Sequence, residues 1–141
     1  MKLQIFRLLF DFGLVVLIWL VQLVIYPGMS YYSRDRLVKW HKKYTGRITF
    51  VVVPLMTGQF LIAVLQFLED FSLYTLGSVL VLITLWGLTF LIFVPLHNSI
   101  ASNKKCDVIV NALVRKNKIR TALWTVLFLW SFLHYLLIDY I

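Results

Sequence analysis

The stretch 73–96, LYTLGSVLVLITLWGLTFLIFVPL, decides the fold class, because it contains no Asp, Glu, Lys or Arg. A helix that crosses a membrane needs about 20 consecutive residues that are mainly apolar. An isolated extended strand would leave its backbone groups without hydrogen-bond partners in lipid, so a segment of this kind must be helical. The stretch is therefore predicted to be a transmembrane helix.

Three further stretches, 8–26, 48–68 and 121–138, share this composition. Pro27-Gly28 ends the first of them, and Glu69-Asp70 ends the second. A chain of 141 residues supports one domain. Residues 1–141 are therefore predicted to form a single all-α integral membrane domain, an antiparallel bundle of four transmembrane helices.

The charged residues are concentrated between the apolar stretches. Hydrophobic residues make up 61% of the chain and charged residues 14%, where a soluble domain carries roughly half and a quarter. The net charge of +8 comes from basic residues that flank the spans. Nucleic acid is therefore excluded as a partner. The expected partners are the lipid bilayer and its anionic headgroups, which attract each nearby Lys or Arg by about 1 kcal/mol.

The orientation follows from the distribution of Lys and Arg. Residues 34–47 hold six of them and residues 104–120 hold six, whereas the N-terminal tail holds two, Lys2 and Arg7. The connection between the second and third spans carries only Glu69 and Asp70. Because basic loops stay in the cytoplasm, both termini are predicted to lie outside it.

The third loop is predicted to contain a short amphipathic cytoplasmic helix. Polar residues recur there at every fourth position, at Asp107, Asn111 and Arg115. Apolar residues such as Ile109 and Leu113 stand beside them. This pattern is typical of a helix that lies on a membrane surface.

Polar side chains within the spans are functional candidates, because they are costly in lipid. Helix direction alternates, which places four of them toward the cytoplasmic end: Gln22, His41, His97 and Arg120. We predict that His41, His97 and Arg120 form the catalytic or anchoring group. Gln22 is predicted to orient a carbonyl with Arg120. Gln59 is predicted to bind the ligand from deeper in the bundle. Trp86 and Trp124 share helix faces with His97 and Arg120, where they would enclose an aromatic ligand.

The two histidines, His41 and His97, leave several chemical roles open. They could share a proton, ligate a metal or bind a haem iron axially. Alternatively, they are interfacial residues that donate hydrogen bonds to carbonyls freed near Gly46 and Pro95. A metal site needs three or four ligands, and only two histidines lie at this depth, so no metal site is predicted.

A second polar group is predicted toward the outer end of the bundle. It contains Asp11, Gln66 and His134. A pair between Asp11 and His134 would neutralise a charge within the membrane. The alternative interpretation of this pair is a proton relay.

Several short motifs carry a resemblance to a known family. They are Tyr26-Pro27, WHKKYTGRIT at 40–49, PLMTGQ at 54–59, VPLHN at 94–98 and NKIRTALW at 117–124. Together they resemble a family of uncharacterised bacterial four-span membrane proteins and, more distantly, the anthrone oxygenase-like superfamily. The resemblance implies a bacterial inner-membrane protein, and it adds Asn98 and Asn117 to the candidate ligand-binding residues. The more distant resemblance also implies an enzyme that inserts oxygen into polycyclic aromatic substrates.

Three functions remain open from the sequence. The first is a protein that binds or oxidises a hydrophobic aromatic or isoprenoid-like small molecule at the cytoplasmic end. The second is a non-catalytic accessory subunit whose basic loops dock a partner membrane protein or anionic lipid. The third is a small transporter, which would require a homo-oligomer because one four-helix bundle has little room for an aqueous path.

Overall fold

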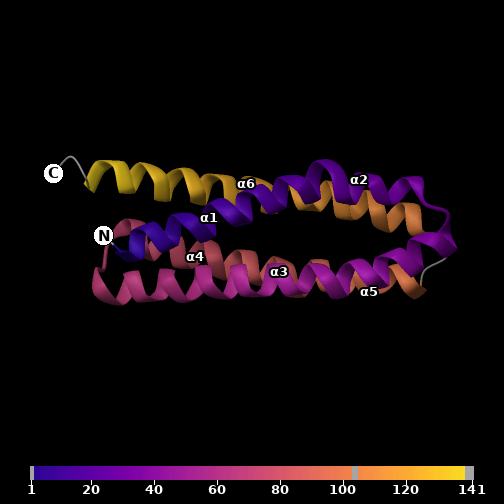
Figure 1. Cartoon of the computed structure of the whole chain (residues 1–141), viewed down its shortest axis with the longest axis horizontal. Helices are drawn as coiled ribbons and strands as arrows, with labels where there is room; N and C mark the ends of the chain where they lie inside the picture. The colour runs from indigo at the N-terminus through magenta and orange to yellow at the C-terminus, as the bar shows by residue number, and fades with distance from the viewer. Residues whose placement is uncertain (1, 103–104, 139–141) are drawn as a thin grey trace.

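The computed structural model describes residues 2–102 and 105–138, and in it four long helical rods form an antiparallel bundle (Figure 1). The predicted all-α four-helix architecture is confirmed. The elements in chain order are α1 (Lys2–Leu20), η1 (Val21–Ile25), α2 (Tyr26–Gly28), η2 (Met29–Tyr31), α3 (Arg34–Glu69), α4 (Leu73–Leu88), η3 (Thr89–Phe93), α5 (Val94–Ser102) and α6 (Cys106–Ile138).

The rods are longer than the predicted spans, mainly at one end. All four are long and apolar enough to cross a membrane. The 36 residues of α3 extend over about 54 Å at 1.5 Å per residue. The hydrocarbon core of a bilayer is about 30 Å thick. A rod of this length therefore reaches well beyond the hydrocarbon core.

The two ends of the bundle differ in composition. Both chain termini and the connection at Asp70–Ser72 lie at one end, which we call the terminal end (Figure 1). The turn at Tyr32–Ser33 and the start of α6 lie at the other, which we call the basic end because residues 34–47 and 105–120 carry most of the Lys and Arg. Ser33 is the residue that precedes the first turn of α3.

The predicted amphipathic segment around residues 107–115 is helical, but it is not a separate helix. It forms the first turns of α6, which runs unbroken from Cys106 to Ile138 because this stretch contains no Gly or Pro. Its apolar side chains, Ile109, Val110 and Leu113, are buried within the bundle. The amphipathic pattern therefore serves packing against the other helices.

Two rods contain a π-helical turn that ends two residues before a proline. η1 precedes Pro27 and η3 precedes Pro95. A proline ring collides with the carbonyl four residues earlier, which is Leu23 or Leu91 here, and both of these lie within the π turns. Widening the helix at this point relieves the collision. Such turns are frequent at functional sites.

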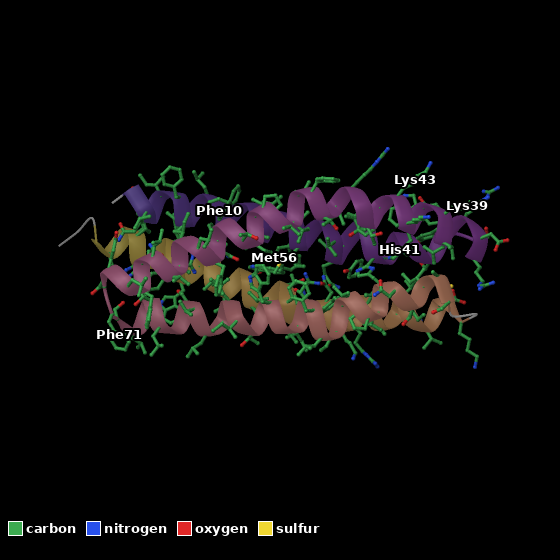
Figure 2. The ribbon with its side chains drawn as sticks, turned by 90° about the horizontal axis from the view of Figure 1, so that it is seen from below. Phe10, Lys39, His41, Lys43, Met56 and Phe71 are labelled. Carbon is green, nitrogen blue, oxygen red and sulfur yellow. The ribbon has the colours of Figure 1, made fainter. Side chains whose placement is uncertain are left out.

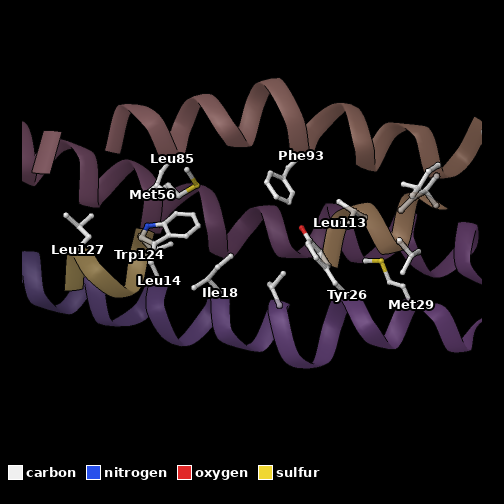
Figure 3. Packing of buried hydrophobic residues seen from close by; sticks show 14 of the residues in the cluster. Leu14, Ile18, Tyr26, Met29, Met56, Leu85, Phe93, Leu113, Trp124 and Leu127 are labelled. Atoms are coloured by element: carbon white, nitrogen blue, oxygen red, sulfur yellow. The ribbon is translucent and has the colours of Figure 1, made fainter. Parts of the chain in front are cut away.

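The rods are arranged as a square in cross-section. α1 packs against α3 and α6, and α4 packs against the same two helices, so α1 and α4 lie diagonally opposite. Apolar side chains from all four rods meet between them, as Leu14, Met56, Leu85, Trp124 and Leu127 show (Figure 3). η1 and η3 belong to the diagonal pair and therefore flank the same central space.

Gly77 is expected to be essential for close packing at the terminal end. A Cβ atom there would lie 2.5 Å from the ring of Trp130, which is itself packed edge-on against Tyr74. We expect Gly77→Ala to lower the free energy of unfolding by about 1–3 kcal/mol, because the ring has to move. Equilibrium unfolding of both proteins in mixed detergent micelles measures this change in free energy. Gly87→Ala is the control, since nothing lies within 4 Å of its Cβ position; equal effects of the two changes would contradict this account.

Candidate functional site

The two histidines at the basic end meet in a chain of hydrogen bonds. His41 Nε2 lies 2.7 Å from His97 Nδ1, and His97 Nε2 lies 2.9 Å from the Tyr26 hydroxyl. Figure 2 shows His41 pointing into the bundle, while its neighbours Lys39 and Lys43 point away from it. A neutral His97 satisfies both bonds when one ring nitrogen donates and the other accepts. Side chains from α2, α3 and α5 are thereby joined.

Arg120 lies beside this chain, on α6, and is 7% exposed. Its guanidinium carbon stands 4.2 Å from the centre of the Phe93 ring and 5.2 Å from that of Trp124. It also interacts electrostatically with the hydroxyls of Tyr26 and Tyr44. Its buried Nε has no hydrogen-bond partner among the described residues. Aromatic faces thus hold a cation that retains donor capacity.

A cavity of about 340 Å³ opens beneath these polar residues. Tyr26, His97 and Arg120 form its polar wall, and apolar side chains such as Ile18, Met56 and Phe93 line most of the remainder. Both π turns contribute lining residues, among them Val21 and Thr89. This volume is at the lower end of the range for small-molecule sites, which are mostly apolar with a few convergent polar groups.

The cavity reaches the molecular surface between α3 and the η3–α5 segment. Five of its lining residues on these elements are exposed: Thr49, Val53, Phe90, Val94 and Asn98. Three of the five are apolar. An opening of this composition suits the entry of a hydrophobic molecule from the side of the bundle.

The structure brings most of the predicted site residues to this cavity. Five of them line it: Trp86, His97, Asn98, Arg120 and Trp124. His41 does not line the cavity but is hydrogen-bonded to His97. Trp124 is buried, Trp86 is half-buried, and Asn98 stands at an exposed edge. The buried indole nitrogen of Trp86 has no partner among the described residues.

Gln22 and Asn117 take a different place from the predicted one. Asn117 Nδ2 donates to Gln22 Oε1 at 3.1 Å, and Gln22 Nε2 donates to the Val114 carbonyl at 3.2 Å. Both side chains are buried, and neither lines the cavity. They join η1 to α6 and so hold one wall of the cavity in place.

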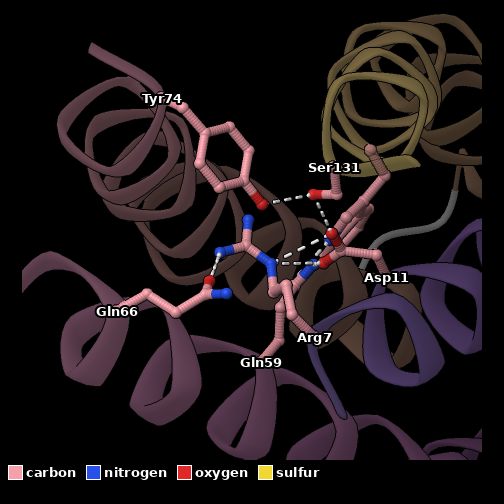
Figure 4. Close-up of polar contacts among 7 residues, drawn as sticks. Arg7, Asp11, Gln59, Gln66, Tyr74 and Ser131 are labelled. Atoms are coloured by element: carbon pink, nitrogen blue, oxygen red, sulfur yellow. Dashed lines mark hydrogen bonds and ion pairs between the residues drawn. The ribbon is translucent and has the colours of Figure 1, made fainter. Parts of the chain in front are cut away.

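Gln59 belongs to a second polar cluster, which lies toward the terminal end (Figure 4). Arg7 Nε donates to both carboxylate oxygens of Asp11, at 2.9 and 3.0 Å. Gln59 and Ser131 also donate to this carboxylate, at 2.6 and 2.5 Å. The cluster continues through Gln66, Tyr74 and Trp124. All four rods are thereby tied to one buried ion pair.

The predicted pairing of Asp11 with His134 is wrong, because Arg7 is the counterion of Asp11. Arg7 is 1% exposed, so it does not belong to a solvated N-terminal tail as the sequence suggested. The ring of His134 instead stacks on Tyr74 with the two centroids 3.9 Å apart. The four-residue spacing of Arg7 and Asp11 on one helix was the signal that could have revealed the pair.

The histidine geometry does not suit axial ligation of a haem iron. Two nitrogens on opposite sides of one metal lie about 4 Å apart, at roughly 2 Å each from the ion. The facing nitrogens of His41 and His97 are 2.7 Å apart and bonded to each other. Within residues 2–102 and 105–138, no group of three or more His, Cys, Asp or Glu side chains could hold a metal ion. The site therefore has the chemistry of proton sharing and hydrogen bonding.

Several cavity residues were not identified from the sequence, above all Tyr26, Tyr44 and Phe93. Aromatic residues within a span usually face lipid or pack, so composition alone does not select these three. Tyr26 was detectable in principle, because it follows Gln22 by four residues and shares its helix face. No family model, curated protein or solved structure matches the chain.

Proposed function

We propose that this chain is an integral membrane protein that binds a hydrophobic aromatic or isoprenoid-like ligand in the cavity at the basic end of the bundle. The observation that carries the proposal is the cavity itself: an apolar chamber with one polar wall, formed by Tyr26, His97 and Arg120. A ligand with an oxygen-bearing head and a hydrophobic body matches both parts. A longer hydrophobic tail would leave through the lateral opening.

The distribution of charge supports insertion with the basic end in the cytoplasm. Apart from Arg7 and Arg120, every Lys and Arg whose side chain the structure describes is exposed, and all of these lie at the basic end. Exposed basic side chains on the cytoplasmic side attract anionic headgroups. In this placement, in a bacterial inner membrane, the cavity lies in the cytoplasmic leaflet and its opening faces the acyl chains.

The residues around the cavity take distinct roles in the proposal. Arg120 and the Tyr26 hydroxyl contact the polar head of the ligand. His97, which is itself held by His41, positions the Tyr26 hydroxyl. Trp86 and Trp124 both line the cavity and contact the apolar body. The accessory-subunit alternative assigns all function to the exposed basic residues, and it makes no use of an internal chamber.

The proposal is tested by binding of 2-naphthamide, a neutral bicyclic aromatic with one polar head, to the protein in lipid nanodiscs. We expect saturable binding after subtraction of empty nanodiscs. His97→Phe should weaken it about tenfold, because the Tyr26 hydroxyl then loses the partner that fixes it at the polar wall. His134→Phe is the matched control, since His134 stacks on Tyr74 away from the cavity. Absence of saturable binding to the wild type would overturn the proposal and favour the accessory role.

A further inference from the structure

The protein buries two arginines, and only one of them has a counterion in the structure. Arg7 is 1% exposed and forms an ion pair with Asp11 at 2.9 Å. Arg120 is 7% exposed, and no described carboxylate forms a salt bridge with it. Both lie within apolar helices of the same bundle. Among the described residues, a carboxylate neutralises the guanidinium of Arg7 but not that of Arg120.

A buried charge without a partner is costly, and arginine does not lose its proton in proteins. The rings of Phe93 and Trp124 offset part of this cost through cation–π contacts. The Tyr26 hydroxyl adds a polar contact. None of these groups carries a negative charge. The described residues that line the cavity include no Asp or Glu, so the cavity wall has an uncompensated positive charge.

We infer that the ligand itself supplies the missing charge, and that it binds as a singly charged oxyanion on an apolar body. This inference rests on the proposed function of the cavity and specifies the class of its ligand. Carboxylates and ionised phenols share this chemistry. The guanidinium of Arg120, which lines the cavity, is the counterion, because a charged donor binds an oxyanion more strongly than a neutral donor does.

The positions of the neighbouring groups fit an anionic head. The flat guanidinium is held between Phe93 and Trp124, which fixes its orientation toward the cavity that all three residues line. The Tyr26 hydroxyl lies on the same wall and can donate a second hydrogen bond to the ligand when the Nε2–H of a neutral His97 donates to the Tyr26 oxygen. A neutral head would use these donors but would leave the charge of Arg120 unpaired.

The test compares 2-naphthoate with 2-naphthamide, which have the same ring system and nearly the same shape. Binding is measured by isothermal titration calorimetry in nanodiscs of zwitterionic lipid, so that surface charge does not concentrate the anion. We expect the wild type to bind 2-naphthoate at least about tenfold more tightly than 2-naphthamide. In Arg120→Gln this preference should disappear, whereas Arg120→Lys should keep part of it.

Each outcome distinguishes the inference from the proposed function. Binding of both probes with equal affinity, or of the amide alone, would overturn the anion inference and leave the cavity a ligand site. Binding of neither probe would overturn both. A preference that survives in Arg120→Gln would also overturn the inference, because another group would then supply the charge. Binding of 2-naphthamide by Arg120→Gln shows that the variant is folded.

Discussion

Replacing Asp11 by alanine is expected to lower the free energy of unfolding by about 3–5 kcal/mol, because Arg7 would become a buried charge without a partner. Asp11 is fully buried and accepts hydrogen bonds from Arg7, Gln59 and Ser131. Its loss would leave donors on three rods unpaired. Unfolding of the purified protein in mixed detergent micelles measures the change.

Two control variants separate the ion pair from general effects of the substitution. Asp35→Ala, at an exposed position near the start of α3, should change stability by less than about 0.5 kcal/mol. The double variant Arg7→Met with Asp11→Leu removes both charges, and it should recover much of the loss. If the double variant is less stable than Asp11→Ala, the unpaired charge is not the cause.

Filling the cavity is expected to abolish ligand binding without unfolding the protein. Val52 is half-buried on α3 and lines the cavity. In Val52→Trp the indole would occupy space that the ligand needs, so 2-naphthamide binding should weaken by more than about tenfold. Filling a void adds van der Waals contacts, so stability should stay within about 1 kcal/mol of the wild type or rise.

The neighbouring residue offers a matched control for this variant. Val51 is 49% exposed and does not line the cavity, so Val51→Trp makes the same chemical change on the outer face of α3. We expect it to bind 2-naphthamide as the wild type does. Equal binding by both variants would mean that the probe sits elsewhere. A loss of binding in both would show that the substitutions act through the structure of α3.

The fold was predictable because a membrane-spanning helix requires a long run of apolar residues, which is visible in the sequence. Residues 73–96 and the three other stretches correspond to the four rods. The extension of α3 toward the basic end was predictable as well, since residues 33–44 contain no Gly or Pro, and α3 begins at Arg34. The π turns were not predicted from the sequence, although the rings of Pro27 and Pro95 are the steric cause of them.

The pairing of the two histidines in the candidate site was predictable, but the positions of the polar residues around them were less so. His41 and His97 could be placed at one depth because helix direction alternates, and the structure joins them directly. The hydrogen-bond partners of the other polar residues depend on which groups their side chains can reach. Gln59 turns toward Asp11, and Gln22 toward Asn117, because buried amides bond to whichever polar group is nearest. Such choices depend on the packing of four helices, which helix periodicity alone does not determine.

The central claim is that the cavity holds a hydrophobic ligand, and methionine methyl NMR tests it directly. Met56 lines the cavity, whereas Met29 is buried at the basic end and does not line it. In protein labelled with ¹³C at the methionine methyls, titration with 2-naphthamide should shift the Met56 signal through the ring current of the bound probe. The Met29 signal should stay in place. A Met56 signal that does not move at saturating probe would contradict the account.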